Sequence, residues 1–229
     1  MAIYFLLGAL TLLGAVVAVG RIAQVTGKRN LKSLAGETSV FGLAGNSLAT
    51  EKFAIRKAAR EKGLEGEIAI GDYLNQLAKE YGLTVLHDLS MPNSKANIDH
   101  LMVSKKAVFV LDSKNYAGLV NIRKDQSGAV QLFVGKYNRT NLAMKLKQYS
   151  DSITSHLESE EIDIPVIPLL AFYKATFHPQ SKFSINGVVV NVAGIENELI
   201  RFSRGSGKEF DIKLTTKSIL EHFPVKNPQ

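Results

Sequence analysis

Two acidic residues and a lysine stand inside stretches that otherwise have the composition of buried β-strands. Asp99 lies in the run NIDHLMVS, and Asp112 and Lys114 lie in the next run, AVFVLDSK. Charged side chains are seldom placed in such runs unless another group pairs with them. Because side chains alternate along a strand, Asp112 and Lys114 are predicted to point to one face and Ser113 to the other.

A hairpin between these two strands would bring the carboxylates of Asp99 and Asp112 together beside the Lys114 ammonium. Two carboxylates at such a short distance repel each other unless a cation lies between them. Their oxygen atoms suit Mg²⁺ or Mn²⁺, which leave room for a substrate phosphate. A lysine beside a metal-bound water can orient that water and balance charge on phosphorus. The pattern fits phosphodiester hydrolysis, and Glu67 could add a third carboxylate. From spacing alone, a structural salt bridge at a sheet edge is the alternative.

The elements that must position these residues are indicated by hydrophobic spacing. Residues 51–82 are rich in helix formers, and we expect Gly63 and Gly66 to break this helix in two and Gly82 to end it. Strands are predicted at 84–91, 97–104, 107–114, 119–123, 129–134, 166–173 and 186–192, and further helices at 138–159, 195–203 and 215–223. This order of elements predicts an α/β sandwich with a central mixed sheet.

The N-terminal segment has the composition of a membrane anchor. Residues 3–20 carry no charge, and as a helix they would be about 27 Å long, enough to cross a hydrocarbon core. A cleaved signal peptide is the alternative. The basic residues that follow predict a single-pass anchor with the N-terminus outside and the domain in the cytoplasm. We therefore divide the chain into an anchor (1–20), a flexible basic tether (21–50) and a folded domain (51–229).

The net charge of +7 is concentrated beside the predicted anchor. Residues 21–62 hold nine Lys or Arg and three Glu, so the remainder of the chain is nearly neutral. Anionic lipid headgroups attract such a basic flank, and overall basicity is therefore weak evidence for nucleic-acid binding. The chain has no cysteine, which excludes disulfides, thiolate catalysis and cysteine-type zinc sites.

Taken together, Gly66-Glu67, NIDHLMVS and AVFVLDSKNYAG resemble the nuclease-related domain family, NERD. That family is placed in the restriction-endonuclease-like, or PD-(D/E)xK, superfamily. The resemblance covers about residues 62–158 and implies a restriction-endonuclease-like sandwich. The family more often has Glu where this chain has Asp112, and the Asn-Pro that usually begins its following helix is absent here.

The resemblance also implies roles for individual residues. The catalytic positions of the superfamily match Glu67, Asp99, Asp112 and Lys114. The three carboxylates and the backbone carbonyl of Ser113 would hold Mg²⁺ or Mn²⁺, and Lys114 would position the attacking water. Accessory candidates are His100, Asn115 and Gln148.

Two functions are consistent with these observations. The first is a membrane-anchored, metal-dependent nuclease that acts on DNA in preference to RNA. The alternative is a catalytically inactive nuclease-like module that binds nucleic acid or a protein partner at the membrane, which the near-neutral charge of residues 63–229 favours. A stretch of basic and aromatic residues could track a phosphate backbone, although a solvated helix face is equally consistent: Lys136, Tyr137, Arg139, Lys145, Lys147 and Tyr149. The sequence gives no indication of the oligomeric state.

Overall fold

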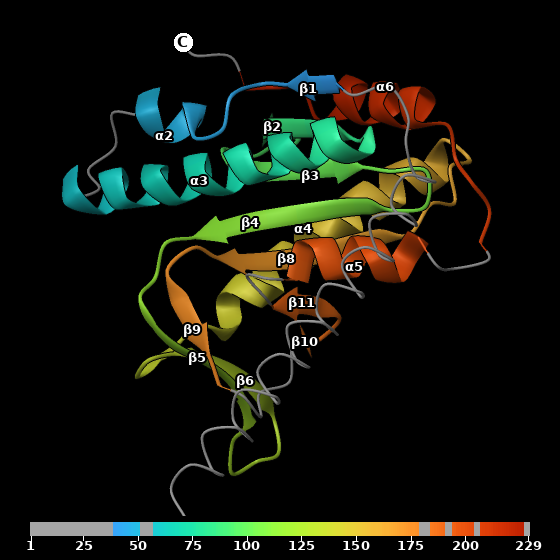
Figure 1. The fold of residues 1–229 in the computed structure, drawn as a ribbon. Coiled ribbons are helices and arrows are strands. Elements are labelled where there is room, and N and C mark those ends of the chain that lie inside the picture. Colours follow the sequence, from blue (N-terminus) through green and yellow to red (C-terminus); the bar gives the residue numbers. More distant parts are fainter. Residues whose placement is uncertain (1–38, 51–56, 179–183, 191–193, 204–206, 227–229) are drawn as a thin grey trace, which may run out of the picture.

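A seven-stranded mixed sheet forms the centre of the domain (Figure 1). The computed structural model describes residues 39–50, 57–178, 184–190, 194–203 and 207–226. In sheet order the strands are β1 (Ser39–Phe41), β2 (Thr84–Ser90), β3 (Asn97–Val103), β4 (Val108–Lys114), β8 (Val166–Phe172), β11 (Val188–Val190) and β10 (Ser184–Ile185). The chain runs antiparallel through β2, β3 and β4, whereas β8 lies parallel to both β4 and β11. The predicted α/β class and mixed sheet are confirmed.

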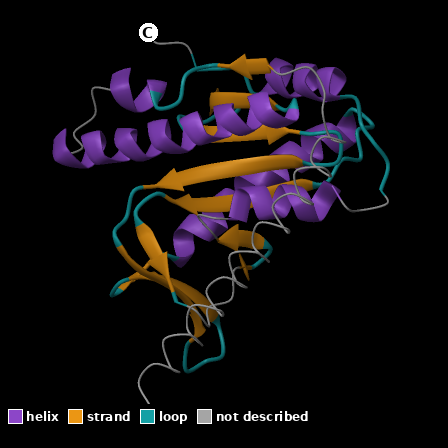
Figure 2. Cartoon of the chain, in the orientation of Figure 1, coloured by secondary structure: helices purple, strands orange, loops and turns teal. Residues whose placement is uncertain are grey.

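Helices cover both faces of this sheet and produce three layers (Figure 2). On one face, α3 (Lys57–Tyr81) and α5 (Gly194–Ser203) bury residues such as Leu74 and Leu199. On the other, α4 (Thr140–Ser159) and α6 (Ile212–His222) bury residues such as Leu146 and Ile219. The strands between the two cores are apolar on both sides, which explains why β2, β3 and β4 read as nearly continuous hydrophobic runs.

A second, four-stranded sheet projects from the end of the domain where β4 finishes (Figure 1). Its strands, in order, are β7 (Tyr137–Asn138), β6 (Val130–Val134), β5 (Gly118–Lys124) and β9 (Ala175–Phe177). The predicted strands at 119–123 and 129–134 are confirmed as β5 and β6. The strand β9 follows directly after β8 and pairs with β5, so the ends of β4 and β8 continue together into this sheet.

The N-terminal boundary of the fold differs from the predicted tether. Residues 39–50 include β1 and α2 (Asn46–Thr50) and belong to the domain. They are held by specific contacts: β1 pairs with β2, and the backbone N–H of Ser47 donates a hydrogen bond to the carboxylate of Asp88. The predicted anchor at 3–20 lies outside the described residues. Within the described ranges, no helix has the length and apolar character needed to span a membrane.

The helix α3 runs unbroken through Gly63 and Gly66, so the predicted break was wrong. Gly66 serves close packing instead: a Cβ atom there would lie 2.8 Å from the Cβ of Asn115, in the loop after β4. Gly82, with a φ of +64°, ends the helix as predicted. The absence of a side chain at Gly66 lets the first half of α3 approach the end of β4, where the candidate site lies.

We predict that Gly66→Ala destabilises the domain by about 1–3 kcal/mol, because the new methyl group meets a buried side chain held by the backbone of the loop. Urea denaturation would measure the change. The matched control is Gly63→Ala in the same helix, whose Cβ would meet only the terminal methyl of Leu48 at 3.2 Å. Gly63→Ala is expected to be neutral or stabilising, and an equal effect of both substitutions would contradict the argument.

Candidate functional site

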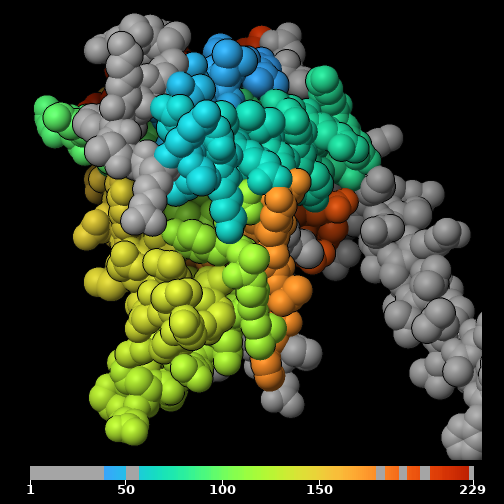
Figure 3. All heavy atoms as spheres, turned by 90° about the vertical axis from the view of Figure 1, so that its left-hand side faces the viewer, coloured from blue at the N-terminus to red at the C-terminus, as the bar shows by residue number. Residues whose placement is uncertain are grey.

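The residues singled out by the sequence meet where β3, β4 and α3 come together. Asp99 is the third residue of β3, and Asp112 and Lys114 end β4. The two strands pair as the predicted hairpin, and α3 carries Glu67 across the same end of the sheet. Figure 3 views the molecule from this side, with the start of α3 above the chain that leaves β4.

Lys114 lies at the centre of a cluster of oxygen atoms. Its Nζ is 2.8 Å from Asp112 Oδ2 and 3.8 Å from Asp99 Oδ2. It also donates a hydrogen bond of 2.9 Å to the backbone carbonyl of Ser113. The predicted proximity of the two aspartates and the lysine is therefore observed. Whether these residues are catalytic stays a prediction.

Burial sets the protonation of the cluster. Asp99 is 7% exposed, and desolvation raises its pKa to about 6 against the attraction of Lys114 and the hydrogen bond from the Ser113 N–H. Glu67 is equally buried, and desolvation together with the charge of Asp99 raises its pKa to about 9. Burial alone would lower the pKa of Lys114, but the carboxylates of Asp112 and Asp99 outweigh it and raise that pKa. At neutral pH, Glu67 holds a proton and Lys114 is charged.

The oxygen atoms of the cluster are of the kind that binds a hard cation, although in the described structure they surround the Lys114 ammonium. No group of three or more His, Asp or Glu side chains in the described part of the chain is arranged to hold a metal ion. The atoms around Lys114 Nζ are nevertheless carboxylate and carbonyl oxygens, which are the ligands that Mg²⁺ and Mn²⁺ prefer. The Lys114 side chain is 22% exposed, so it has access to solvent from the cluster.

His100 does not face the cluster directly. It is fully buried, and its Nε2 lies 3.1 Å from the hydroxyl of Ser113. Its Nδ1 lies 2.8 Å from Nδ1 of His87, whose Nε2 is 3.0 Å from the amide oxygen of Asn75. His100 is therefore shielded from solvent, and its accessory role stays a prediction. The histidines instead form a buried layer behind Ser113.

The hydrogen bonds between the side chains of this layer run from His100 to Asn75. The amide oxygen of Asn75 accepts from His87 Nε2, so Nδ1 of His87 accepts from His100 Nδ1, and His100 Nε2 is left as an acceptor beside the Ser113 hydroxyl. That hydroxyl has one proton and two acceptors within reach, His100 Nε2 at 3.1 Å and Asp99 Oδ2 at 3.3 Å. Burial lowers the pKa of His87 to about 4 and that of His100 well below its ordinary value, so both rings are neutral. Through Ser113 the layer fixes the backbone that contacts Asp99 and Lys114.

The two other accessory candidates differ in position. Asn115 is buried and joins the end of β4 to α3, because its Nδ2 donates to the carbonyl of Lys62 and to the carboxylate of Glu65. Its Oδ1 is buried without a hydrogen-bond partner among the described residues. Gln148 lies on α4 with an exposed side chain, and no described hydrogen bond joins that side chain to the cluster.

Asp88 is a buried acidic residue that the sequence analysis missed. It lies on β2 between His87 and Leu89, whose partners on β3 flank Asp99. Its carboxylate accepts hydrogen bonds from the Ser47 N–H and, at 2.9 Å, from Asn97 Nδ2, and its charge contributes to the raised pKa of Glu67. The sequence contained the signal that identified Asp99 and Asp112, because Asp88 is likewise an acidic residue within an otherwise apolar strand.

A small basic and aromatic cavity adjoins the cluster. Its volume is about 190 Å³, and its lining residues are Lys62, Tyr116, Ala117, Val134, Tyr137 and Arg139. The guanidinium of Arg139 lies 4.7 Å from the ring centre of Tyr116 and 5.3 Å from that of Tyr137. The buried Nε of Arg139 has no hydrogen-bond partner among the described residues. Tyr116 follows Lys114 by two residues, so this cavity opens next to the candidate site.

The rest of the predicted basic stretch is divided. Lys136 lies 5.5 Å from the ring centre of Tyr137, beside the cavity. On α4, Lys147 forms an ion pair with Asp151, and Lys145 lies 5.4 Å from the ring centre of Tyr149. Tyr137 and Arg139 are thus the members of the stretch that line the cavity.

Residues 62–173 match the family model of the nuclease-related domain. The chain contains a nuclease-related domain. The match extends beyond the predicted range of 62–158 to include β8, the strand that pairs with the whole of β4. Neither curated proteins nor solved structures give a match to the chain. The restriction-endonuclease-like assignment of this domain therefore stays a prediction, while its α/β class and its nuclease-related family are established.

The raised pKa of Glu67 generates a stability prediction for the nuclease-related domain. Its pKa is higher in the folded chain, at about 9, than its ordinary value of 4.5. The folded state therefore binds this proton more tightly than the unfolded state. The resulting stabilisation is complete below pH 4.5 and is lost as the pH rises through 9.

We expect Glu67→Gln, which cannot ionise, to flatten this decline and to raise the free energy of unfolding by about 1–3 kcal/mol near pH 9. Urea denaturation between pH 5 and 9 would measure it. Glu61→Gln is the control, since Glu61 is an exposed residue of the same helix that forms an ion pair with Lys57 at 3.9 Å. A pH profile of Glu67→Gln parallel to that of the unaltered chain would contradict the assigned protonation.

Proposed function

We propose that the nuclease-related domain is a metal-dependent nuclease that hydrolyses phosphodiester bonds, in DNA in preference to RNA. We further propose that residues 3–20 anchor the chain in a membrane with the domain in the cytoplasm. The observation that supports the activity best is the convergence of Asp99, Asp112 and Lys114, beside the cavity that contains Arg139. Hydrolysis of a phosphodiester needs charge stabilisation and a positioned water, and these residue types supply both.

Asp99, Asp112, Glu67 and the carbonyl of Ser113 would hold Mg²⁺ or Mn²⁺. A bound ion of this kind supplies Lewis-acid stabilisation of phosphate oxygens and lowers the pKa of bound water. Glu67 has to release its proton to act as a ligand, so metal affinity should increase with pH. The buried histidine layer and Asp99 would hold Ser113 in place if Lys114 moved to admit the ion.

The remaining groups have roles that follow from their chemistry. With its carboxylate partners occupied, the ammonium of Lys114 would hold the attacking water beside the phosphate. Arg139, whose Nε lacks a partner within the described structure, would bind a neighbouring phosphate. Tyr137 is 57% exposed and could stack on a base, which tolerates many sequences because every base presents a π face.

We predict that the purified full-length chain nicks supercoiled plasmid only with Mg²⁺ or Mn²⁺, and that Lys114→Ala lowers the rate by about 100-fold or more. Lys114→Arg keeps the positive charge that the buried carboxylates require, so it should fold and remain nearly as inactive, because a planar guanidinium cannot replace the ammonium. Lys105→Ala is the control, since Lys105 is paired with Glu209 at the opposite end of β4. Full activity of folded Lys114→Ala would refute the assigned role.

The alternative of an inactive module is favoured by one observation. Lys114 already neutralises Asp112 and Asp99, and the described residues form no ready-made metal site. Calorimetry with Mn²⁺ distinguishes the two functions. The nuclease requires measurable binding that weakens in Asp112→Asn, whereas the module predicts that neither protein binds.

For the nucleic-acid partner, we predict that Arg139→Ala weakens binding to single-stranded DNA. The slope of log affinity against log salt concentration should become shallower by about one, the value of one phosphate contact. Fluorescence anisotropy at several salt concentrations would measure both effects. Arg201→Ala is the matched control, because Arg201 pairs with Glu198 on α5. Equal salt slopes for Arg139→Ala and the unaltered chain would show that Arg139 binds no phosphate.

A further inference from the structure

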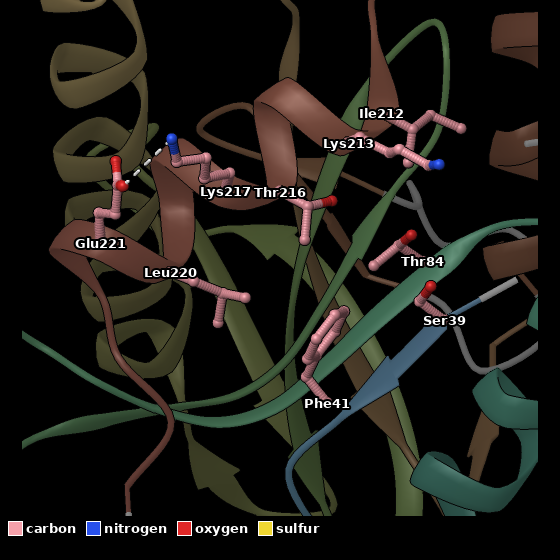
Figure 4. A pocket seen from close by; sticks show the side chains of 9 residues that line it. All are labelled: Ser39, Phe41, Thr84, Ile212, Lys213, Thr216, Lys217, Leu220 and Glu221. Atoms are coloured by element: carbon pink, nitrogen blue, oxygen red, sulfur yellow. Dashed lines mark ion pairs between the residues drawn. The ribbon is translucent and has the colours of Figure 1, made fainter. Parts of the chain in front are cut away.

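A second cavity lies away from the candidate site, between β1 and α6 (Figure 4). Its volume is about 460 Å³, within the range of sites for small molecules. Strand pairing places Ser39 beside Thr84 and Phe41 beside Leu86, so Ser39 and Phe41 face α6 with Thr84. The helix contributes Ile212, Lys213, Thr216, Lys217, Leu220 and Glu221, which form one stripe along it.

The hydroxyl of Thr216 has no hydrogen-bond partner among the described residues, although Thr216 is 95% buried at 5% exposure. The neighbouring Thr215 satisfies its hydroxyl within the helix, because its Oγ1 donates a 2.8 Å hydrogen bond to the carbonyl of Asp211, four residues earlier. Figure 4 shows the Thr216 hydroxyl directed toward the part of the cavity where Thr84 and Ser39 lie. A buried hydroxyl without a partner costs free energy, which a ligand group could recover.

The cavity has an apolar end, beside which the Lys217–Glu221 ion pair lies, and a polar end (Figure 4). Phe41 and Leu220 lie toward one end, and Phe41 is 39% exposed in the absence of any covering group among the described residues. The hydroxyl groups and the Lys213 side chain lie toward the other. The charged residues of the lining are two lysines and Glu221, and Lys217 lies 3.7 Å from Glu221, so the lining carries net positive charge.

We propose that this cavity binds a small amphipathic carboxylate, with its aromatic or aliphatic body against Phe41 and Leu220. The carboxylate accepts a hydrogen bond from the Thr216 hydroxyl and is attracted by Lys213, the lysine at the polar end. This site is separate from the cluster around Lys114 and does not depend on nuclease activity. Apart from Thr84 on β2, its residues come from β1 and α6, which lie before and after the residues that match the family model.

Calorimetric titration of the full-length chain with 3-phenylpropionate tests the proposal. We expect saturable binding, weaker by about fivefold in Thr216→Val, because one hydrogen bond to a charged acceptor is lost while the shape is kept. The neutral analogue 3-phenylpropanamide should also bind more weakly than the carboxylate. Without ligand, Thr216→Val should melt at the same or a higher temperature, since it removes a hydroxyl that has no partner.

The matched control is Thr215→Val, in which a bonded hydroxyl of the same helix is removed. It should lower the melting temperature and leave the affinity for 3-phenylpropionate unchanged. Leu220→Trp should fill the apolar end and abolish binding. Absence of saturable binding to the folded, unaltered chain would overturn the proposal, and so would equal affinities of Thr216→Val and the unaltered chain.

Discussion

The charge of Lys114 is the interaction on which this end of the domain depends. Asp99 and Asp112 end up beside each other because β3 and β4 pair, and Glu67 is brought near by the close approach of α3. Acidic groups buried together raise one another's pKa unless a cation compensates them. Lys114 provides that cation at 2.8 Å from Asp112 and 3.8 Å from Asp99, while Glu67 remains protonated. Removing the lysine would leave buried carboxylates uncompensated, which is costly whatever the site does.

The backbone beneath this ion-pair cluster is held by neutral groups. A chain of hydrogen bonds joins the Ser113 side chain to Asn75 through His100 and His87, and the Ser113 N–H donates to Asp99. Burial keeps both imidazoles neutral, so the layer adds no charge to a region that is already crowded with charges. A neutral layer of this kind can define the position of β4 without competing with Lys114 for the carboxylates.

The sequence allowed the charged cluster to be predicted because its residues violate the apolar pattern of two adjacent strands. Because side chains alternate along a strand, Asp112 and Lys114 were predicted on one face of the sheet. The short turn between β3 and β4 predicted that these strands form a hairpin. The same reasoning applied to β2 would have found Asp88. The role of His100 was not predictable, because alternation shows that it faces away from Asp99 but not that His87 and Ser113 meet it there.

Other features depend on tertiary contacts that no local pattern encodes. Gly66 resembles a helix breaker in sequence, yet it is retained within α3 because Asn115 packs against it. Residues 39–50 resemble a linker, yet β1 and α2 are ordered by pairing with β2 and by the Asp88 carboxylate. The start of α6 is a different case, because a local signal sets it. Asp211 caps the helix by accepting hydrogen bonds from the N–H groups of Lys213 and Leu214, and the helix therefore begins three residues before the predicted position.

The identity of the central cation links structure to the proposed chemistry. The oxygens that contact Lys114 Nζ are among those that the proposal assigns to a divalent ion, so the ammonium and the ion cannot occupy the same place. A lysine can resolve this conflict because its charge is compact and its four-carbon chain can rotate toward solvent, where part of it is already exposed. An arginine would bind the carboxylates through a rigid fork and would be harder to displace. Under the proposed function, this flexible cation would stabilise the buried carboxylates and would leave them when a metal ion binds.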